Sequence, residues 1–159
     1  MAIQYVTGDA TVPMGDGPRV ILHCCNDVGL WGSGFVLALS RRWPEAQRAY
    51  FRWYEKRHNG DTPFELGKVQ FVLVDPVSPI WVANMIGQRG IRGKTNPKPV
   101  QYSAILRGLD TVHDFCVREK ASVHAPRFGA GLASGSWDVI EGLINEVLAE
   151  VPVTIYDLA

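Results

Sequence analysis

Apolar residues occur in two kinds of segment along this chain: short runs typical of strands, and longer stretches with helical spacing. The short runs lie between turn residues and predict strands at 3–6, 20–24, 69–74, 80–85, 121–123 and 153–156. The helical spacing predicts helices that begin at Phe35 and Pro44, and two more over 100–117 and 137–148. Strands interleaved with helices in this way predict an α/β sandwich with about six strands.

The connection between the third and fourth predicted strands is short, because only residues 75–79 separate them. A link of this length favours an antiparallel pair, so the sheet is expected to be mixed. Residues 86–99 show no period and are rich in Gly, Arg, Lys, Asn and Pro, which predicts a long loop. In sheets of this class ligands bind beyond the carboxyl ends of the strands.

Two glycine-rich turns, at 26–34 and 126–132, each follow a strand-like run and precede a helical pattern. A strand-turn-helix junction points free backbone N–H groups and a positive helix end at one place, which suits a phosphate group. Two such junctions on one chain predict a ligand that carries a diphosphate. The glycines of the first turn are spaced GxxGxG and no Lys-Ser/Thr pair follows, so this turn is neither a dinucleotide fingerprint nor a P-loop.

The composition narrows the classes of partner. The chain has 159 residues with 16 basic and 16 acidic side chains, so it carries no net charge, which argues against a nucleic-acid partner. We expect one domain over 1–159 that is a monomer. The three cysteines have no metal-ligand spacing, so we expect buried thiols, no metal and no cofactor. No apolar stretch approaches about 18 residues and no leader pattern is seen, so we expect a cytoplasmic protein without a membrane partner.

Taken together, these features resemble the macro domain, an ADP-ribose-binding module. The resemblance runs through almost the whole chain, and its motifs are Gly8-Asp9-Ala10, His23-Cys24-Cys25-Asn26, Trp31-Gly32-Ser33-Gly34 and Pro126-Arg127-Phe128-Gly129-Ala130-Gly131-Leu132. It implies a three-layer α/β/α macro-domain fold with a mixed sheet of about six strands. The His-Cys strand end and the Trp-Gly-x-Gly turn resemble the branch with the yeast-type ADP-ribose 1″-phosphate phosphatase and the terminal ADP-ribose protein glycohydrolase.

The resemblance also implies a set of ligand contacts. Asp9 would accept a hydrogen bond from the adenine amino group, or would only cap its turn. Asn26 would face the distal ribose, and Trp31 or Phe128 would cover a ribose or belong to the core. The substrate-binding residues expected from it are Asp9, Ala10, Asn26, Val28, Trp31, Gly32, Ser33, Gly34, Arg89, Arg127, Phe128, Gly129, Ala130, Gly131 and Leu132.

The expected catalytic residues are Asn26, Asp27, His23 and Gln88. His23 is either a buried imidazole or a group near the bond that is cut, and Asp27 is either an acid or base or a solvated carboxylate. The glycohydrolase of this branch uses a lysine and an aspartate whose positions correspond here to Gln88 and Ala133. A covalent lysine intermediate is therefore not expected. Water would attack instead, with Asp27, His23 or the substrate's own phosphate as the base.

The resemblance implies a hydrolase that removes ADP-ribose from glutamate- or aspartate-linked sites of mono-ADP-ribosylated proteins. Its partners would then be ADP-ribose and ADP-ribosylated proteins. Two alternatives stay open: a phosphatase for ADP-ribose 1″-phosphate, and a reader that binds ADP-ribose and releases it unchanged. A weaker one is a scaffold whose pocket no longer binds.

Overall fold

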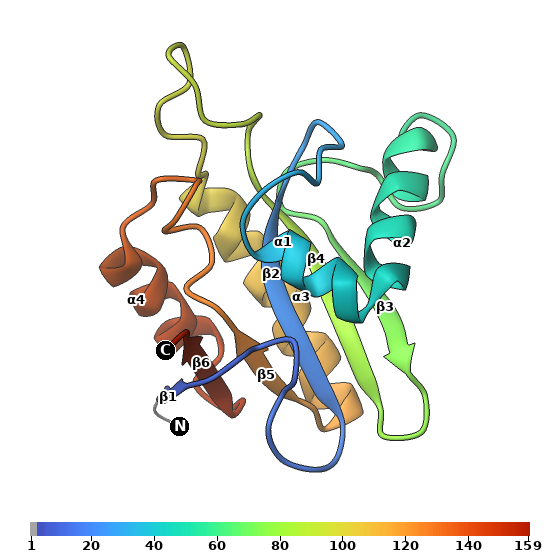
Figure 1. The fold of residues 1–159 in the computed structure, drawn as a ribbon, viewed down its shortest axis with the longest axis vertical. Coiled ribbons are helices and arrows are strands. Elements are labelled where there is room, and N and C mark those ends of the chain that lie inside the picture. The colour runs from blue at the N-terminus through green and yellow to red at the C-terminus, as the bar shows by residue number, and fades with distance from the viewer. Residues whose placement is uncertain (1–2) are drawn as a thin grey trace.

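The computed structural model describes residues 3–159, which form one six-stranded sheet with helices on both faces (Figure 1). The strands lie in the order β1-β6-β5-β2-β4-β3, and every neighbouring pair is parallel except β3 and β4. The elements are β1 (Gln4–Thr7), β2 (Arg19–Asn26), α1 (Phe35–Arg42), α2 (Pro44–Glu55), β3 (Val69–Asp75), β4 (Ile80–Gln88), α3 (Tyr102–Glu119), β5 (Ser122–Ala125), α4 (Trp137–Val147) and β6 (Val153–Asp157).

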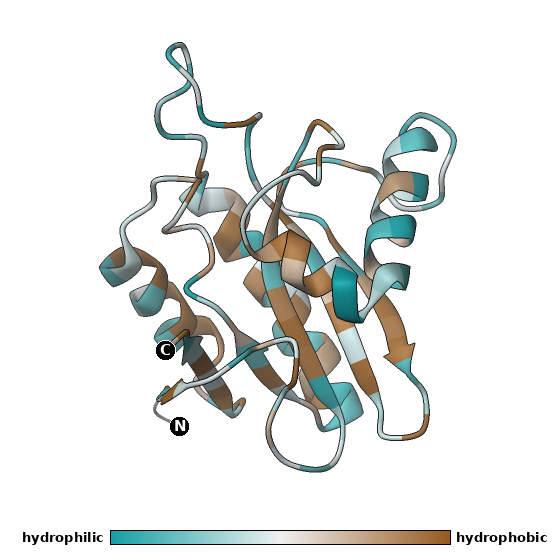
Figure 2. Ribbon diagram, in the orientation of Figure 1, coloured by the Kyte–Doolittle hydropathy of each residue, from teal (hydrophilic) through white to brown (hydrophobic). Residues whose placement is uncertain are grey.

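The central strand β2 separates two hydrophobic cores. Val20 and Leu22 point into a core built with α3 and α4, while Ile21 and Cys25 point into a core built with α1 and α2. Figure 2 shows the apolar colouring that runs along the middle of β2 and β4. A strand covered on both faces reads as a continuous apolar run, as 20–22 does here. The predicted three-layer α/β/α fold with a mixed sheet is confirmed.

Most predicted elements are present, and the antiparallel pairing of β3 with β4 is confirmed. The prediction that the loop begins at Ile86 was wrong, because β4 continues to Gln88, whose Cα partner is Asn26 of β2. Gly87 hid this continuation in the sequence. A Cβ atom at Gly87 would lie 2.6 Å from Cys24 Sγ, so the strand needs glycine where α3 and β2 approach it.

This arrangement brings the carboxyl ends of β2, β4 and β5 to one edge of the sheet. The glycine turns follow β2 and β5 at that edge, and the long loop follows β4 and projects from the body of the molecule (Figure 1). Ser136 is the N-cap residue of α4 but makes no capping hydrogen bond with its side chain. Its backbone amide instead donates to Tyr102 Oη at 2.8 Å, which ties α4 to α3. Within the described chain, no helix combines the length and the apolar character needed to cross a bilayer.

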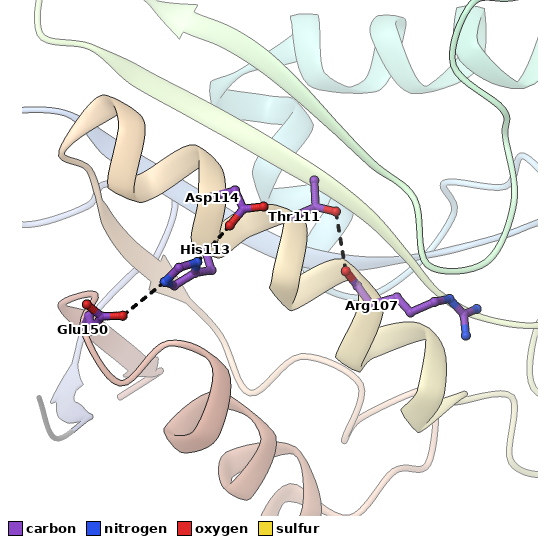
Figure 3. Close-up of polar contacts among 5 residues, drawn as sticks. All are labelled: Arg107, Thr111, His113, Asp114 and Glu150. Carbon is purple, nitrogen blue, oxygen red and sulfur yellow. Dashed lines mark hydrogen bonds and ion pairs between the residues drawn. The ribbon is translucent and has the colours of Figure 1, made fainter.

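A charged contact on the outer face of α3 links this helix to the segment after α4 (Figure 3). His113 Nδ1 lies 3.0 Å from Asp114 Oδ1, and its Nε2 lies 3.4 Å from Glu150 Oε1. The hydrogen bond to Asp114 and the contact with Glu150 raise the pKa of His113 above its ordinary value. The protonated imidazole therefore stabilises the fold at low pH, and this stabilisation is lost as the pH rises through the folded-state pKa.

We expect His113→Gln to remove this pH-dependent contribution. Relative to wild type, the variant should lose about 1 °C in melting temperature at pH 5.5 and nothing at pH 8.5, because the pair is exposed. Differential scanning calorimetry across this range measures the difference. His58→Gln, which removes another exposed imidazole, is the matched control, and an equal effect of both substitutions would contradict the assignment.

Candidate ligand-binding site

A cavity of about 800 Å³ lies at the carboxyl edge of the sheet, between the two glycine turns. The ends of β2 and β4, both turns and the start of the long loop form its wall. No Asp or Glu of the described chain lines it, whereas Arg92 and Arg127 do. The lining residues are His23, Cys24, Cys25, Asn26, Leu30, Trp31, Gly32, Ser33, Gly34, Phe35, Val36, Gln88, Ile91, Arg92, Pro126, Arg127, Phe128, Gly129, Gly131, Leu132 and Ala133.

The two glycine turns face each other across this cavity. A Cβ atom at Gly34 would lie 3.1 Å from Leu132 Cδ1, so the turns touch at this point. Within the described chain, no hydrogen bond engages the backbone N–H groups at 32–34, nor those of Gly129, Gly131 and Leu132. Gly34 also caps the N-terminus of α1, whose first turn has no acidic residue. Free amides beside a positive helix end form an anion-binding site.

The side chain of Asn26 organises the first turn from the end of β2. Its Oδ1 accepts hydrogen bonds from the Val28 and Leu30 amides at 3.0 and 3.2 Å, and its Nδ2 donates to the Leu30 carbonyl at 2.9 Å. The hydroxyl of Tyr50, 2.9 Å from Oδ1 and 2.8 Å from the Asn26 carbonyl oxygen, lies against both. The side-chain amide of Asn26 thus has one N–H left for a ligand, and its other hydrogen bonds fix the conformation of the turn.

His23 is held by a chain of buried amides that leads through the sheet to α2. Its Nε2 lies 2.6 Å from Asn84 Oδ1, and Asn84 Nδ2 donates to the Ala46 carbonyl and to Gln70 Oε1. Both amide hydrogens of Asn84 are donated to those two acceptors, so Asn84 Oδ1 can only accept a hydrogen bond from His23. The imidazole proton is therefore on Nε2. Nδ1 therefore carries the lone pair, and the buried Cys25 thiol is its neighbour, with Sγ at 4.0 Å. Burial lowers the pKa of His23 to about 4, although the Asn84 hydrogen bond opposes this shift. The imidazole is neutral at physiological pH.

The cysteines and aromatic residues of the wall are parts of the core. Burial raises the pKa of the Cys24 thiol to about 12, so it is not a thiolate nucleophile at neutral pH. Trp31 is 6% exposed and donates to the Val36 carbonyl, and its ring meets that of His23 edge-on at 5.4 Å. Phe128 is 4% exposed and packs edge-on against Trp137. Both aromatics therefore present only part of their surface to the cavity.

Asp27 and Arg89 lie outside this cavity and line a separate cleft. Asp27 Oδ1 accepts a hydrogen bond from the Gly90 amide at 2.7 Å, which ties the first turn to the long loop. Gln88 lines the cavity, and its Nε2 donates to the Gly90 carbonyl at 3.0 Å. The four expected catalytic residues are therefore divided: His23, Asn26 and Gln88 line the cavity, whereas Asp27 lines the separate cleft.

Arg127 reaches the cavity wall, but its guanidinium is paired elsewhere. Its Nε and a terminal nitrogen contact the two Asp157 carboxylate oxygens at 2.7 and 3.0 Å, in a fork-like pair beside Tyr5 and Trp137. Arg92, a residue of the long loop, lines the cavity together with Ile91. Within the long loop, Asn96 Nδ2 donates to the Arg89 and Ile91 carbonyls. These two hydrogen bonds fix the backbone of the segment that carries Ile91 and Arg92.

Five expected contact residues do not line the cavity: Asp9, Ala10, Val28, Arg89 and Ala130. Asp9 Oδ1 accepts from the amide and hydroxyl of Thr11 at 2.9 and 2.8 Å, so this carboxylate caps its turn. Sequence reasoning missed Tyr50 and Asn84, which hold Asn26 and His23. Both sit at positions that read as ordinary core residues, so no local signal marks them. Among residues 3–159, no three His, Cys, Asp or Glu side chains gather where they would bind a metal ion.

Two glycines of the first turn provide a test of its geometry. We expect Gly29→Ala to destabilise the fold by about 2–4 kcal/mol, since Gly29 has φ +75° and an added Cβ would lie 2.5 Å from the Tyr54 ring. Gly32→Ala meets no atom within 4 Å and should cost less than about 0.5 kcal/mol. Urea denaturation measures both, and equal stability of the two variants would refute this account of the turn.

No protein-family model matches the chain. Among curated proteins, it is similar to chromodomain-helicase-DNA-binding protein 1-like from Danio rerio, with 33% identity over 93% of this chain but only 14% of that protein. The corresponding Mus musculus protein is 31% identical, over 98% of this chain and 18% of its own length. ADP-ribose 1″-phosphate phosphatase from Debaryomyces hansenii is 26% identical, with 91% of this chain and 93% of that protein covered.

The chain is also similar to solved structures. A Bacteroides thetaiotaomicron protein of unknown function is 47% identical, covers 99% of both chains and superposes with a TM-score of 0.91. Thermosipho africanus DarTG in complex with ADP-ribose is 19% identical, with a TM-score of 0.75 over 99% of this chain and 42% of that one, which shows a shared fold. A macrodomain protein from Streptomyces coelicolor is 49% identical over 98% of both chains with a TM-score of 0.84, and this chain therefore belongs to the macrodomain family.

Proposed function

We propose that this protein binds ADP-ribose in the cavity and hydrolyses the ester that joins ADP-ribose to glutamate or aspartate side chains of proteins. The observation that carries the proposal is the pair of glycine turns, whose unengaged amides face a cavity without a carboxylate. A diphosphate needs several N–H donors and is repelled by nearby acids. The names of two similar proteins, an ADP-ribose complex and an ADP-ribose 1″-phosphate phosphatase, support the choice of ligand.

In this proposal the diphosphate lies between Gly32–Gly34 and Gly129–Leu132, where the N-terminus of α1 adds its positive end. Two arginines line the cavity wall. Arg127 is paired with Asp157, whereas Arg92 forms no ion pair with any described residue and is available to the diphosphate. The distal ribose would then lie toward Asn26 and Gln88, which are Cα partners at the ends of β2 and β4. The remaining N–H of Asn26 is available to orient it.

His23 is the proposed general base. Asp27 turns to the other cleft and binds Gly90, whereas His23 lines the cavity and has its lone pair on Nδ1, where the long 4.0 Å contact with the Cys25 thiol is a weak one. Water would add to the ester carbonyl carbon while Nδ1 takes its proton. The tetrahedral intermediate would then expel the ribose oxygen, which receives that proton, and the carboxylic acid is released. No lysine or aspartate is required at the positions of Gln88 and Ala133.

A reader that binds ADP-ribose without cleaving it is the second candidate. The same absence of a carboxylate from the described wall favours it, because a neutral imidazole with a low pKa is a weak base. Phosphatase activity on ADP-ribose 1″-phosphate is the third candidate, and its support is the name of the 26% identical Debaryomyces hansenii protein.

ADP-ribose binding tests the cavity itself. At one hundred times its Kd the ligand should stabilise the fold by about 2.7 kcal/mol, which is about 5–10 °C in melting temperature. We expect Gly131→Leu to keep the wild-type melting temperature without ligand, since a Cβ there meets no atom within 4 Å, and to weaken binding at least about tenfold by filling the cavity.

Gly142→Leu is the matched control, because Gly142 is equally open but lies on α4, away from the cavity. Isothermal titration with ADP-ribose compares the three proteins. Wild-type affinity of the Gly131→Leu variant would place the ligand elsewhere.

Hydrolysis is tested by release of ADP-ribose from a protein mono-ADP-ribosylated on glutamate. The rate should be independent of His23 ionisation at pH 6–8 and fall as the pH drops toward about 4, where the imidazole becomes protonated. His23→Gln retains an amide donor for Asn84 and should lower kcat by about 10²-fold or more.

His124→Gln is the control for burial. His124 has its pKa lowered to about 4 by burial as well, but it bonds Ser122 and Tyr156 and does not line the cavity. Its variant should keep the wild-type pH profile. Tight ADP-ribose binding with no release at any pH would favour the reader, and phosphate release from ADP-ribose 1″-phosphate alone would favour the phosphatase.

A further inference from the structure

A second hollow of about 690 Å³ lies beside the cavity and has a different chemical character. Residues 64–68 form one side of it, Arg107 and Thr111 of α3 form another, and Asp27 and Arg89 close it. We call this hollow the basic cleft. Long charged side chains line the basic cleft, whereas backbone amides of the glycine turns line the cavity.

The basic cleft and the cavity share a thin wall. Asn26 and Gln88 line the cavity, while the residues that follow them directly, Asp27 and Arg89, line the cleft. The hydrogen bond from the Gly90 amide to Asp27 Oδ1 holds this wall together. A polypeptide attached to a ribose at the Asn26–Gln88 end of the cavity would therefore have the basic cleft as a neighbour.

Three exposed cations of the cleft have no carboxylate partner. Lys68, Arg89 and Arg107 take part in none of the ion pairs formed by the described residues. Arg107 extends from α3 (Figure 3), donates to the Leu66 carbonyl at 3.3 Å and lies against Gly67, where a Cβ atom would be 2.6 Å from its Nε. These contacts hold the guanidinium in the cleft.

The negative charges of the cleft are fewer. Glu65 is exposed, and the Oδ1 of Asp27 is already used by Gly90. Three cations, Lys68, Arg89 and Arg107, therefore stand against two carboxylates, which gives the cleft an excess of positive charge on a chain whose total charge is zero.

We infer that the basic cleft binds acidic side chains that flank the modified residue of a protein substrate. This inference rests on the proposed function, since it assigns the polypeptide end of that substrate. A single-stranded nucleic acid is a poorer fit, because such ligands stack their bases on free aromatic faces. The one aromatic ring of the cleft wall, Phe64, is packed against Tyr50, Trp53 and Tyr54 at 5.0–5.7 Å.

Two fluorescent peptides test the inference. Each carries one ADP-ribose through a hydrolysis-resistant amide link, one flanked by glutamates and the other by glutamines. Wild type at low salt should bind the glutamate peptide about tenfold more tightly, and the ratio should fall as salt is added. Lys68→Gln, Arg89→Gln and Arg107→Gln together should bring the ratio close to one.

The control combines Arg41→Gln, Arg48→Gln and Arg52→Gln, which remove the same charge from exposed positions of α1 and α2. It should keep the wild-type ratio, and free ADP-ribose should bind all three proteins equally. Equal affinity of wild type for both peptides, or a ratio unchanged by the cleft substitutions, overturns the inference. So does a single-stranded oligonucleotide that displaces the glutamate peptide at lower concentration than an unmodified polyglutamate peptide.

Failure of the proposed function gives a different result. If free ADP-ribose does not bind, the cavity assignment is wrong, while the glutamate-to-glutamine ratio still reports on the cleft. If ADP-ribose binds but an ester-linked peptide is not hydrolysed, the protein is a reader. The peptide ratio again decides the cleft separately.

Discussion

The hydrogen bonds of the Asn26 side chain connect the buried central strand to the wall of the cavity. β2 is covered by helices on both faces, so a polar group at its end must find protein partners. Asn26 finds them in the Val28 and Leu30 amides, and the Tyr50 hydroxyl supports it from α2. The direction in which the chain leaves the sheet, and with it the start of α1, depends on this set of bonds.

A second polar arrangement crosses the α1–α2 side of the sheet and sets the state of His23. Gln70 donates to the Ala49 carbonyl of α2 and accepts from Asn84, which in turn accepts from His23. Every member of this chain is satisfied, so the network fixes one imidazole tautomer rather than leaving buried groups unpaired. The same burial that lowers the pKa of His23 also raises that of its neighbour Cys25. The cavity floor formed by these residues is therefore uncharged.

The cavity and the basic cleft differ in the polar groups that they present to a ligand. Backbone amides are short, rigid donors and suit a ligand with fixed geometry such as a diphosphate. Lysine and arginine side chains are long and mobile, and suit ligands whose charges vary in position. The Asp27–Gly90 hydrogen bond keeps these two environments apart by holding the first turn to the long loop.

The sequence by itself determined the order of strands and helices, the antiparallel hairpin and the two glycine turns, because period and turn residues are local properties of a chain. The same motifs predicted the macrodomain family. Only the tertiary structure decided which polar side chains share a space. Asp27 is next to Asn26 in sequence, yet it faces a different hollow, since the two side chains leave the chain in different directions. Arg127 is neutralised by Asp157, which is 30 residues away. Tyr50 and Asn84 read as core residues until their partners are seen. Burial, pairing and the tautomer of His23 depend on contacts between distant segments, and no local pattern records such contacts.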